Sequence, residues 1–169
     1  MAASPSSSSC FTDENVIILH SSDKVIFEID EDVALQMKTI HMYFEDLPLN
    51  GRKFSGLLVA GDILAKVIEY CKKHVKNPDK DGKSDYIEEL ENWDKKFVNR
   101  MDQNTLFGVI NAADYLYVQP LMDLTCKTVA HRIKDLSVEK IREIFNIKND
   151  FTPEEEAKLR KENQWAFDN

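Results

Sequence analysis

Cysteine and histidine residues at short spacing are the first feature of this chain that could support chemistry. Cys71 and His74 form a Cys-x-x-His pattern, and Cys126 and His131 follow later in the sequence. A structural zinc ion needs four ligands at tight spacing, whereas these residues are scattered. Cys71 and Cys126 lie on apolar helix faces, where free cysteine behaves as a small hydrophobic residue. We interpret both as core cysteines and expect no metal and no other cofactor.

Sequence motifs of nucleophilic or phosphate chemistry are also missing. The sequence has no Gly-x-Ser-x-Gly turn, no Gly-rich phosphate loop and no His-Glu-x-x-His pair. The acidic run Glu154 to Glu156 could suggest carboxylate chemistry, but negative charge is favoured in the first turn of any helix. The sequence therefore predicts a protein that is not an enzyme.

Composition and charge narrow the classes of partner and location. The chain has 169 residues, a formal net charge of -8, and 43% hydrophobic residues. An acidic surface argues against nucleic acid, because that affinity comes from Lys and Arg. No apolar run approaches the roughly 20 residues that span a bilayer, and the Ser-rich start lacks a signal peptide's features. Three cysteines without paired spacing fit a reducing compartment. We expect a globular protein of the nucleus and cytoplasm with no membrane partner.

The N-terminal half predicts a small amount of sheet followed by helix. Residues 1–14 are rich in Ser and are interpreted as a disordered tail. Val16 to His20 and Val25 to Ile29 are β-rich runs around a polar turn, which predicts a hairpin. A single helix is expected from Asp30 towards Phe44. Leu57 to Val59 could form one further short strand.

Further along, helical spacing dominates and one loop interrupts it. Asp62 can cap a helix with one apolar face. Residues 77–92 are charged and are interpreted as a solvated loop. Trp93 and Phe97 then begin a second helical region, and Asp102 precedes another apolar face.

The last third predicts three more helices. Pro120 can start a helix, Leu121 to Lys134, that is apolar on more than one side and is therefore expected to be buried between two bodies. Ser137 can cap the next helix. Thr152 to Glu155 form a capping box with Pro at the first helical position, which predicts a last helix over Pro153 to Asn163.

The stretch from Ile141 to Phe167 holds large apolar residues in a segment too charged to bury them on its own. Such a narrow apolar stripe cannot form a core. Either it packs back onto its own domain or it completes a core with another protein, and the residues alone leave both alternatives open.

The run from Ile144 to Glu156, continued by Arg160 to Trp165, resembles the C-terminal signature of the Skp adaptor family of SCF ubiquitin ligases. Ala166 and Phe167 after the Trp match the plant branch. Other segments are similar to the same family: Val16 to Phe27, Ile63 to Cys71, Asp102 to Phe107, and Leu124 to Ala130.

The resemblance implies a fold of the α+β class. It is a BTB/POZ fold, a small β-sheet flanked by helices, with a C-terminal two-helix extension. The implied domains are a BTB/POZ domain over 15–134 and F-box-binding helices over 135–169. It also implies a non-catalytic adaptor that bridges F-box substrate receptors to a cullin scaffold for ubiquitin-dependent degradation.

The site residues implied by the resemblance fall into two sets. The set expected to bind an F-box protein is Leu121, Leu124, Thr125, Ile141, Ile144, Phe145, Ile147, Phe151, Asn163 and Trp165. The set expected to bind a cullin is Asp114, Tyr115 and Leu116.

Departures from the family pattern on the cullin side leave an alternative. Asp114 replaces the family's Asn, Asn111 stands where an apolar residue is usual, and Gly108 replaces a usual Glu. A carboxylate in place of an amide loses N–H donors and gains charge, which predicts weaker cullin binding. The alternative is a divergent paralogue that holds or sequesters F-box proteins. A homodimeric POZ scaffold is a third hypothesis, opposed by the aromatic residues of the C-terminal helices.

Overall fold

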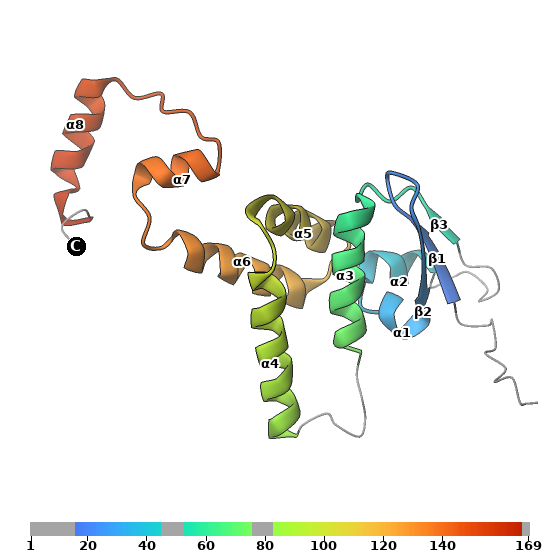
Figure 1. The fold of residues 1–169 in the computed structure, drawn as a ribbon. Coiled ribbons are helices and arrows are strands. Elements are labelled where there is room, and N and C mark those ends of the chain that lie inside the picture. The colour runs from blue at the N-terminus through green and yellow to red at the C-terminus, as the bar shows by residue number, and fades with distance from the viewer. Residues whose placement is uncertain (1–15, 45–52, 76–82, 167–169) are drawn as a thin grey trace, which may run out of the picture. The chain divides into compact units, whose positions relative to one another are not determined.

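The computed structural model describes residues 16–44, 53–75 and 83–166, and it has an α+β fold (Figure 1). In chain order the elements are β1 (Val16–His20), β2 (Ile26–Asp30), α1 (Glu31–Ala34), α2 (Lys38–Phe44), β3 (Lys53–Ser55), α3 (Gly61–Lys73), α4 (Ser84–Asn99), α5 (Gln103–Tyr115), α6 (Gln119–Ile133), α7 (Val138–Ile144), α8 (Pro153–Glu162) and the 3-10 turn η2 (Gln164–Ala166). The tail expected at 1–14 lies outside the described residues.

The chain divides into two compact units, Met1–Thr128 and Val129–Asn169. The division falls inside α6, whereas the sequence analysis places a domain boundary after residue 134. The first unit holds the sheet and the helices up to the first part of α6. The second holds the end of α6 and α7 and α8.

A three-stranded sheet forms one layer of the first unit, with strand order β2-β1-β3. β1 pairs antiparallel with β2, from Val16 opposite Asp30 to His20 opposite Ile26. The predicted hairpin is therefore confirmed. Side chains on β1 alternate, and Ile17 and Leu19 are buried, as expected for a strand with one face on a core.

The third strand lies earlier than the sequence suggests. β3 pairs parallel with β1, with Ile18 opposite Lys53. Gly56 follows at φ 111, a backbone angle that favours glycine, and ends the strand. Leu57 to Val59 are not a strand, so that prediction is wrong. Leu57 is buried and Leu58 is 80% exposed, because the chain crosses the surface here without a strand partner.

The helix predicted from Asp30 to Phe44 is two helices, α1 and α2. Between them, Gln36 N–H donates to the Val33 carbonyl and Met37 N–H to the Ala34 carbonyl, so the backbone tightens into three-residue turns. The Gln36 side chain also donates to the Cys71 carbonyl on α3 at 2.7 Å. This contact with a segment distant in the sequence holds the break, and the single-helix prediction is wrong.

The start of α3 is held by a residue from the hairpin turn. Asp62 caps no helix, because it lies in the first turn of α3. Instead, Asp23 Oδ1 accepts the Gly61 N–H at 2.9 Å and the Ser21 hydroxyl. These hydrogen bonds, that of Ser21 first, lower the pKa of Asp23. A carboxylate from the hairpin thus satisfies a helix N-terminus that sequence analysis assigned to a local residue.

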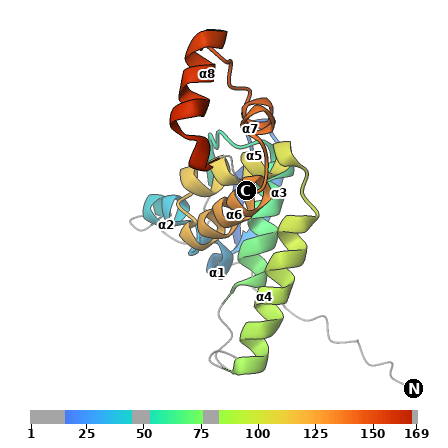
Figure 2. The same cartoon turned by 90° about the vertical axis from the view of Figure 1, so that its left-hand side faces the viewer.

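Helix α4 corrects the prediction of a loop over 77–92. It begins at Ser84, so the loop prediction is wrong from that residue onward, and residues 77–82 lie outside the described chain. Its apolar face carries Trp93 and Phe97, and the Phe97 ring lies 6.0 Å from the Tyr70 ring of α3. Figures 1 and 2 show α4 beside α3 from two directions. Asp85, Glu88, Glu89 and Glu91 are exposed, whereas Asp94 is partly buried beside His74.

The core of the first unit is built between α3 and α5. Leu64 and Val67 of α3 and Leu106 and Val109 of α5 are fully buried. Asp102 accepts the Thr105 N–H at 2.9 Å and caps α5. These side chains fix the positions of both helices, because close-packed interiors tolerate little movement.

Gly108 of α5 permits a close approach of α3. A Cβ atom at this position would lie 2.7 Å from Cδ1 of Ile63. Glycine inside a helix is less favourable than alanine by about 1 kcal/mol. Glycine at this position thus lowers the intrinsic helix stability of α5, but it leaves room for the Ile63 side chain of α3.

A double-mutant cycle tests this packing. In Gly108→Ala we expect unfolding free energy to change by less than about 0.5 kcal/mol, because the gain in helix propensity is offset by a strained Ile63 rotamer. In an Ile63→Val background, which removes Cδ1, the same substitution should stabilise the protein by about 1 kcal/mol. Urea unfolding measures both. If Gly108→Ala changed the unfolding free energy equally in the wild-type and the Ile63→Val backgrounds, residue 108 would not be restricted by the Ile63 side chain.

Candidate functional site

Cys71 and His74 do not face a common site. Cys71 is fully buried, and burial raises the pKa of its thiol to about 12, which confirms it as a core cysteine. The His74 ring stacks on Tyr70 with centroids 4.0 Å apart, its Nδ1 lies 3.0 Å from the Tyr70 carbonyl, and its Nε2 lies 3.2 Å from Asp94. His74 is thus an internal contact between α3 and α4.

Cys126 differs from the expectation, because it is exposed on α6 and is not a core cysteine. The face of α6 that meets the core carries Leu121 and Thr125, so Cys126 points to the solvent side. Within the described ranges, no three His, Cys, Asp or Glu side chains gather as a metal site would require. None of the helices described is long and apolar enough to cross a bilayer.

Both helix starts predicted in the second unit are confirmed. Ser137 accepts the Lys140 N–H and caps α7. Thr152 accepts the Glu155 N–H, and Glu155 accepts the Thr152 N–H at 2.9 Å, so the capping box is complete. Asn146, at φ 52, ends the turn after α7. Local sequence therefore sets the helix ends of this unit.

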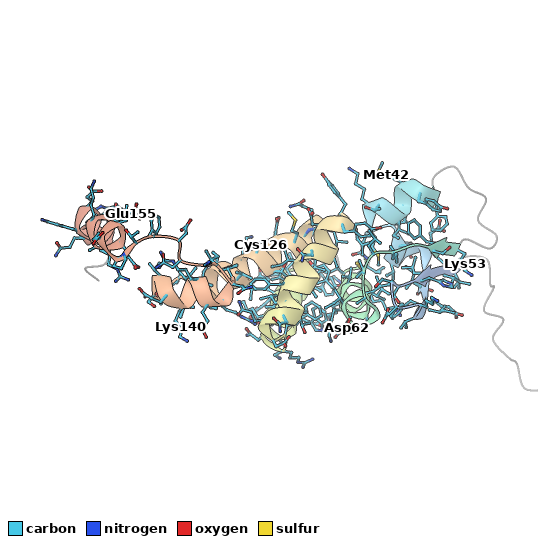
Figure 3. All side chains as sticks on the ribbon, turned by 90° about the horizontal axis from the view of Figure 1, so that it is seen from above. Met42, Lys53, Asp62, Cys126, Lys140 and Glu155 are labelled. Carbon is cyan, nitrogen blue, oxygen red and sulfur yellow. The ribbon has the colours of Figure 1, made fainter. Side chains whose placement is uncertain are left out.

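No side chain described in the second unit is buried, although several are large and apolar. Trp165 is 78% exposed, and Ile147, Phe151 and Phe145 also lie open to solvent. Figure 3 shows the side chains of α8, among them Glu155, spreading outward around the helix. Monomeric proteins seldom leave such residues uncovered without a role in binding. This supports the alternative of a partner surface.

A hollow of about 420 Å³ lies within the second unit. Its apolar wall is Val138, Phe151, Leu159 and Trp165, and its polar wall is Arg142, Glu156, Arg160 and Asn163. Of the residues expected to bind an F-box protein, the structure brings Phe151, Asn163 and Trp165 together here. Ile141, Ile144, Phe145 and Ile147 belong to α7 and the turn after it and do not line the hollow.

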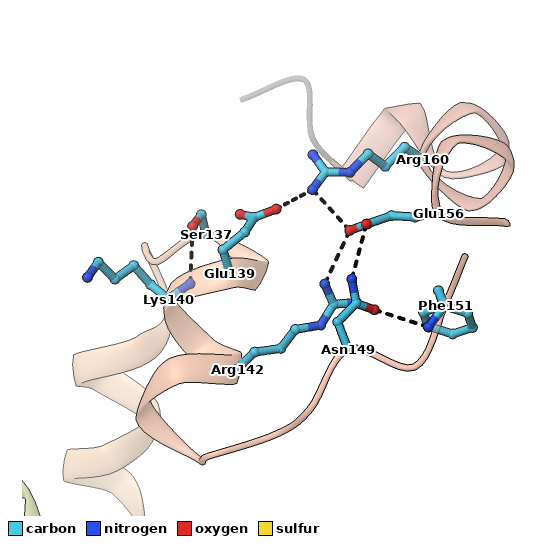
Figure 4. Close-up of polar contacts among 8 residues, drawn as sticks. All are labelled: Ser137, Glu139, Lys140, Arg142, Asn149, Phe151, Glu156 and Arg160. Atoms are coloured by element: carbon cyan, nitrogen blue, oxygen red, sulfur yellow. Dashed lines mark hydrogen bonds and ion pairs between the residues drawn. The ribbon is translucent and has the colours of Figure 1, made fainter. Parts of the chain in front are cut away.

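Four charged side chains join α7 to α8 through three ion pairs, and the backbone of α7 between Glu139 and Arg142 completes the ring (Figure 4). Arg142 Nη1 donates to Glu156 Oε1 at 3.2 Å, and Arg160 Nη2 donates to the same oxygen at 3.4 Å. Arg160 also donates to Glu139, which returns the ring to α7. Asn149 Nδ2 adds a bond to Glu156 Oε2 at 3.2 Å.

The ring is not among the features predicted from the sequence. The four-residue spacing of Glu156 and Arg160 does indicate one of its ion pairs, because residues at this spacing are neighbours on a helix. The contact from Arg142 to Glu156 spans 14 residues and a turn, so no local pattern announces it.

The F-box set on α6 is only partly accessible. Leu121 and Thr125 are fully buried in the first unit, and their assignment as F-box contacts stays a prediction. The Thr125 hydroxyl donates to the Leu121 carbonyl at 2.8 Å, which satisfies this polar group inside the core. Leu124 is partly exposed and stays available.

The cullin set on α5 is similarly divided. Asp114 and Tyr115 are exposed, whereas Leu116 is fully buried, and its assignment as a contact stays a prediction. A second hollow, about 300 Å³ in volume, lies next to them. It is lined by Leu58, Val59, Ala60, Ile63, Gly108, Asn111, Ala112 and Tyr115. Two of the positions that depart from the family pattern, Gly108 and Asn111, thus line this one depression.

Comparison with known proteins finds one family in two parts of the chain, one in the first unit and one that covers most of the second unit. The tetramerisation domain of the Skp1 family matches residues 15–76, and the dimerisation domain of the same family matches residues 119–166. The sheet and helices of the first unit therefore belong to a BTB/POZ fold.

Relatives extend the match over most of the chain. SKP1-like protein 4 of Arabidopsis thaliana is 50% identical over 162 aligned residues, and the match covers 92% of this chain and 98% of that protein. SKP1-like protein 1A of the same plant is 50% identical over 158 residues, covering 90% and 97%. SKP1-like protein 1 of Oryza sativa subsp. japonica is 47% identical over 171 residues, covering 92% and 97%. The chain belongs to the Skp1 family and is of its plant type.

Proposed function

We propose that this chain is the non-catalytic adaptor subunit of an SCF ubiquitin ligase, bridging F-box substrate receptors to a cullin scaffold for ubiquitin-dependent degradation. The observation that carries the proposal is a C-terminal unit whose large apolar side chains have no core of their own. Membership of the Skp1 family supports the same role.

The F-box surface is proposed on the second unit, with Phe151, Asn163 and Trp165 at its centre. An apolar side chain of the F-box would enter the hollow beside Trp165. Burying a Trp in a desolvated pocket is a typical source of binding free energy. Ile141, Ile144, Phe145, Ile147 and Leu124 extend this proposed surface.

The cullin surface is proposed on the exposed face around Asp114 and Tyr115, next to the hollow under Leu58. Leu58 is 80% exposed, so the rim of the hollow offers apolar area to a partner. Asp114 adds a negative charge there, which selects against an acidic partner surface. The described residues give no separate support to a cullin-free role.

The proposed location is the nucleus and cytoplasm. Cys71 and Cys126 are free thiols, which fits a reducing compartment.

Removal of the Trp165 side chain tests the F-box surface. In Trp165→Ala, affinity for a recombinant F-box domain should fall by at least about 1 kcal/mol, roughly fivefold, because a buried aromatic contact is lost. Titration calorimetry measures it. Ile26→Ala is a matched control, since Ile26 is an exposed apolar residue on β2 of the first unit. Unchanged affinity in Trp165→Ala would exclude this residue as an anchor.

Restoring an amide at residue 114 tests the cullin surface. We expect Asp114→Asn to strengthen binding to the N-terminal region of a cullin severalfold, because the added N–H donors and the lost charge favour the interface. F-box affinity should stay constant. Asp85→Asn on α4 makes the same chemical change elsewhere and should alter neither affinity. If cullin affinity stays the same in Asp114→Asn, Asp114 has no part in that surface.

A further inference from the structure

The ring of Glu139, Arg142, Glu156 and Arg160 stands out because it is built into a unit without a buried core. Glu139 and Arg142 belong to α7, and Glu156 and Arg160 belong to α8. Two of the ion pairs, Arg142–Glu156 and Arg160–Glu139, join the two helices, and the third, Arg160–Glu156, lies within α8. A pair of short helices with no buried side chain has little else to fix its spacing.

The ring is also one wall of the hollow. Arg142, Glu156 and Arg160 line it on the polar side, while Glu139 does not. Val138 on α7 and Leu159 on α8 line it on the apolar side. The width of the hollow is therefore set by the distance between α7 and α8, which the ring spans.

We propose that this charged ring positions α7 and α8 for F-box binding before the partner arrives, so that its members act as positioning residues of the F-box surface. The inference rests on the proposed function. Glu156 is its central member, since its carboxylate accepts hydrogen bonds from Arg142, Asn149 and Arg160.

A ring suits this task better than isolated pairs do. A single exposed ion pair contributes only about 0.2–1 kcal/mol, because holding two long side chains opposes it. Shared members reduce that cost: Arg160 and Glu156 each serve two partners. The side chains of Arg142 and Glu156 are only 20% and 27% exposed, so salt weakens this pair less than it weakens a fully exposed pair.

Positioning has a kinetic signature. If only a fraction of free molecules has the hollow open at the right width, apparent affinity is reduced by that fraction. Breaking the ring lowers the fraction, and so lowers the association rate constant. Losing a direct contact with the partner instead raises the dissociation rate constant.

Acid should open the ring in a defined direction. Its own backbone, Ser137 and Arg160 lower the pKa of Glu139 to about 2, and Arg142, Asn149 and Arg160 lower the pKa of Glu156 below its usual 4.5. Because both pKa values are lower in the folded state, their stabilisation is present above about pH 4.5 and is lost as pH falls towards 2. The NMR shifts of α8 amides should follow this loss. Glu156→Gln should remove the part of this change that comes from Glu156, and an unchanged profile would contradict the assignment.

Rate measurements on the full chain with a recombinant F-box domain test the proposal. Glu139→Gln and Glu156→Gln should each lower the association rate constant severalfold and change the dissociation rate constant by less than about twofold. Glu139→Gln is the sharper variant, because Glu139 is no part of the hollow. Glu154→Gln, the same change at an exposed residue in the first turn of α8, is the matched control and should behave as wild type.

A conservative variant provides the rescue. Glu139→Asp keeps a carboxylate for Arg160 at a residue that does not line the hollow, and it should bring association back towards the wild-type rate. Wild-type rates in both Gln variants would overturn the proposal, as would a faster dissociation with unchanged association. If wild type itself does not bind the F-box domain, the proposed function fails. Hydrogen exchange of α8 amides in the free chain then decides on the ring, since the Gln variants must lose protection and the rescue must regain it.

Discussion

The shortage of buried apolar surface beyond Thr128 is the constraint on which the rest of the structure depends. α7 and α8 have well-capped ends, yet none of their described side chains is buried. Helices this short are marginal in water without tertiary packing, so contacts between them must come from charge and from a partner. The same shortage leaves the side chains of Trp165 and Phe151 exposed, which supports the proposed binding surface on this unit.

The first unit differs from the second in having a buried apolar core. Leu64, Val67, Leu106 and Val109 form a closed core between α3 and α5, and the sheet and α4 add to it. Its surface changes can therefore be local: Gly108, Asn111 and Asp114 alter one exposed face without disturbing the core beneath. α6 belongs to this core through Leu121 and Thr125, and it continues into the unit that has none.

Division of labour follows from these two kinds of packing. A rigid core can present a constant surface to a shared scaffold. A helix pair without a core leaves its apolar side chains exposed to different receptors, and a partner can complete the packing that the pair lacks. The family match over both parts of the chain is consistent with such a bridging protein.

Local patterns predicted much of this fold because their causes are local. The hairpin, the Ser137 and Thr152 caps and the apolar stripes of α3 and α5 all follow from neighbouring residues. The BTB/POZ architecture followed from the family resemblance. The prediction of a loop over 77–92 failed for α4, because this helix has many charged residues and its few apolar side chains are buried only by contact with α3.

Contacts between distant residues were decided by the tertiary structure alone. The break between α1 and α2 depends on Gln36 meeting Cys71, and the start of α3 depends on Asp23. Burial of Leu116, Leu121 and Thr125, and exposure of Cys126, depend on which face of a helix meets the core. The sequence by itself determined where α7 and α8 start and that apolar groups of the tail lacked a core. Only the folded chain decided which of those groups line the hollow and which charges hold it, because both depend on distances across space that no sequence spacing encodes.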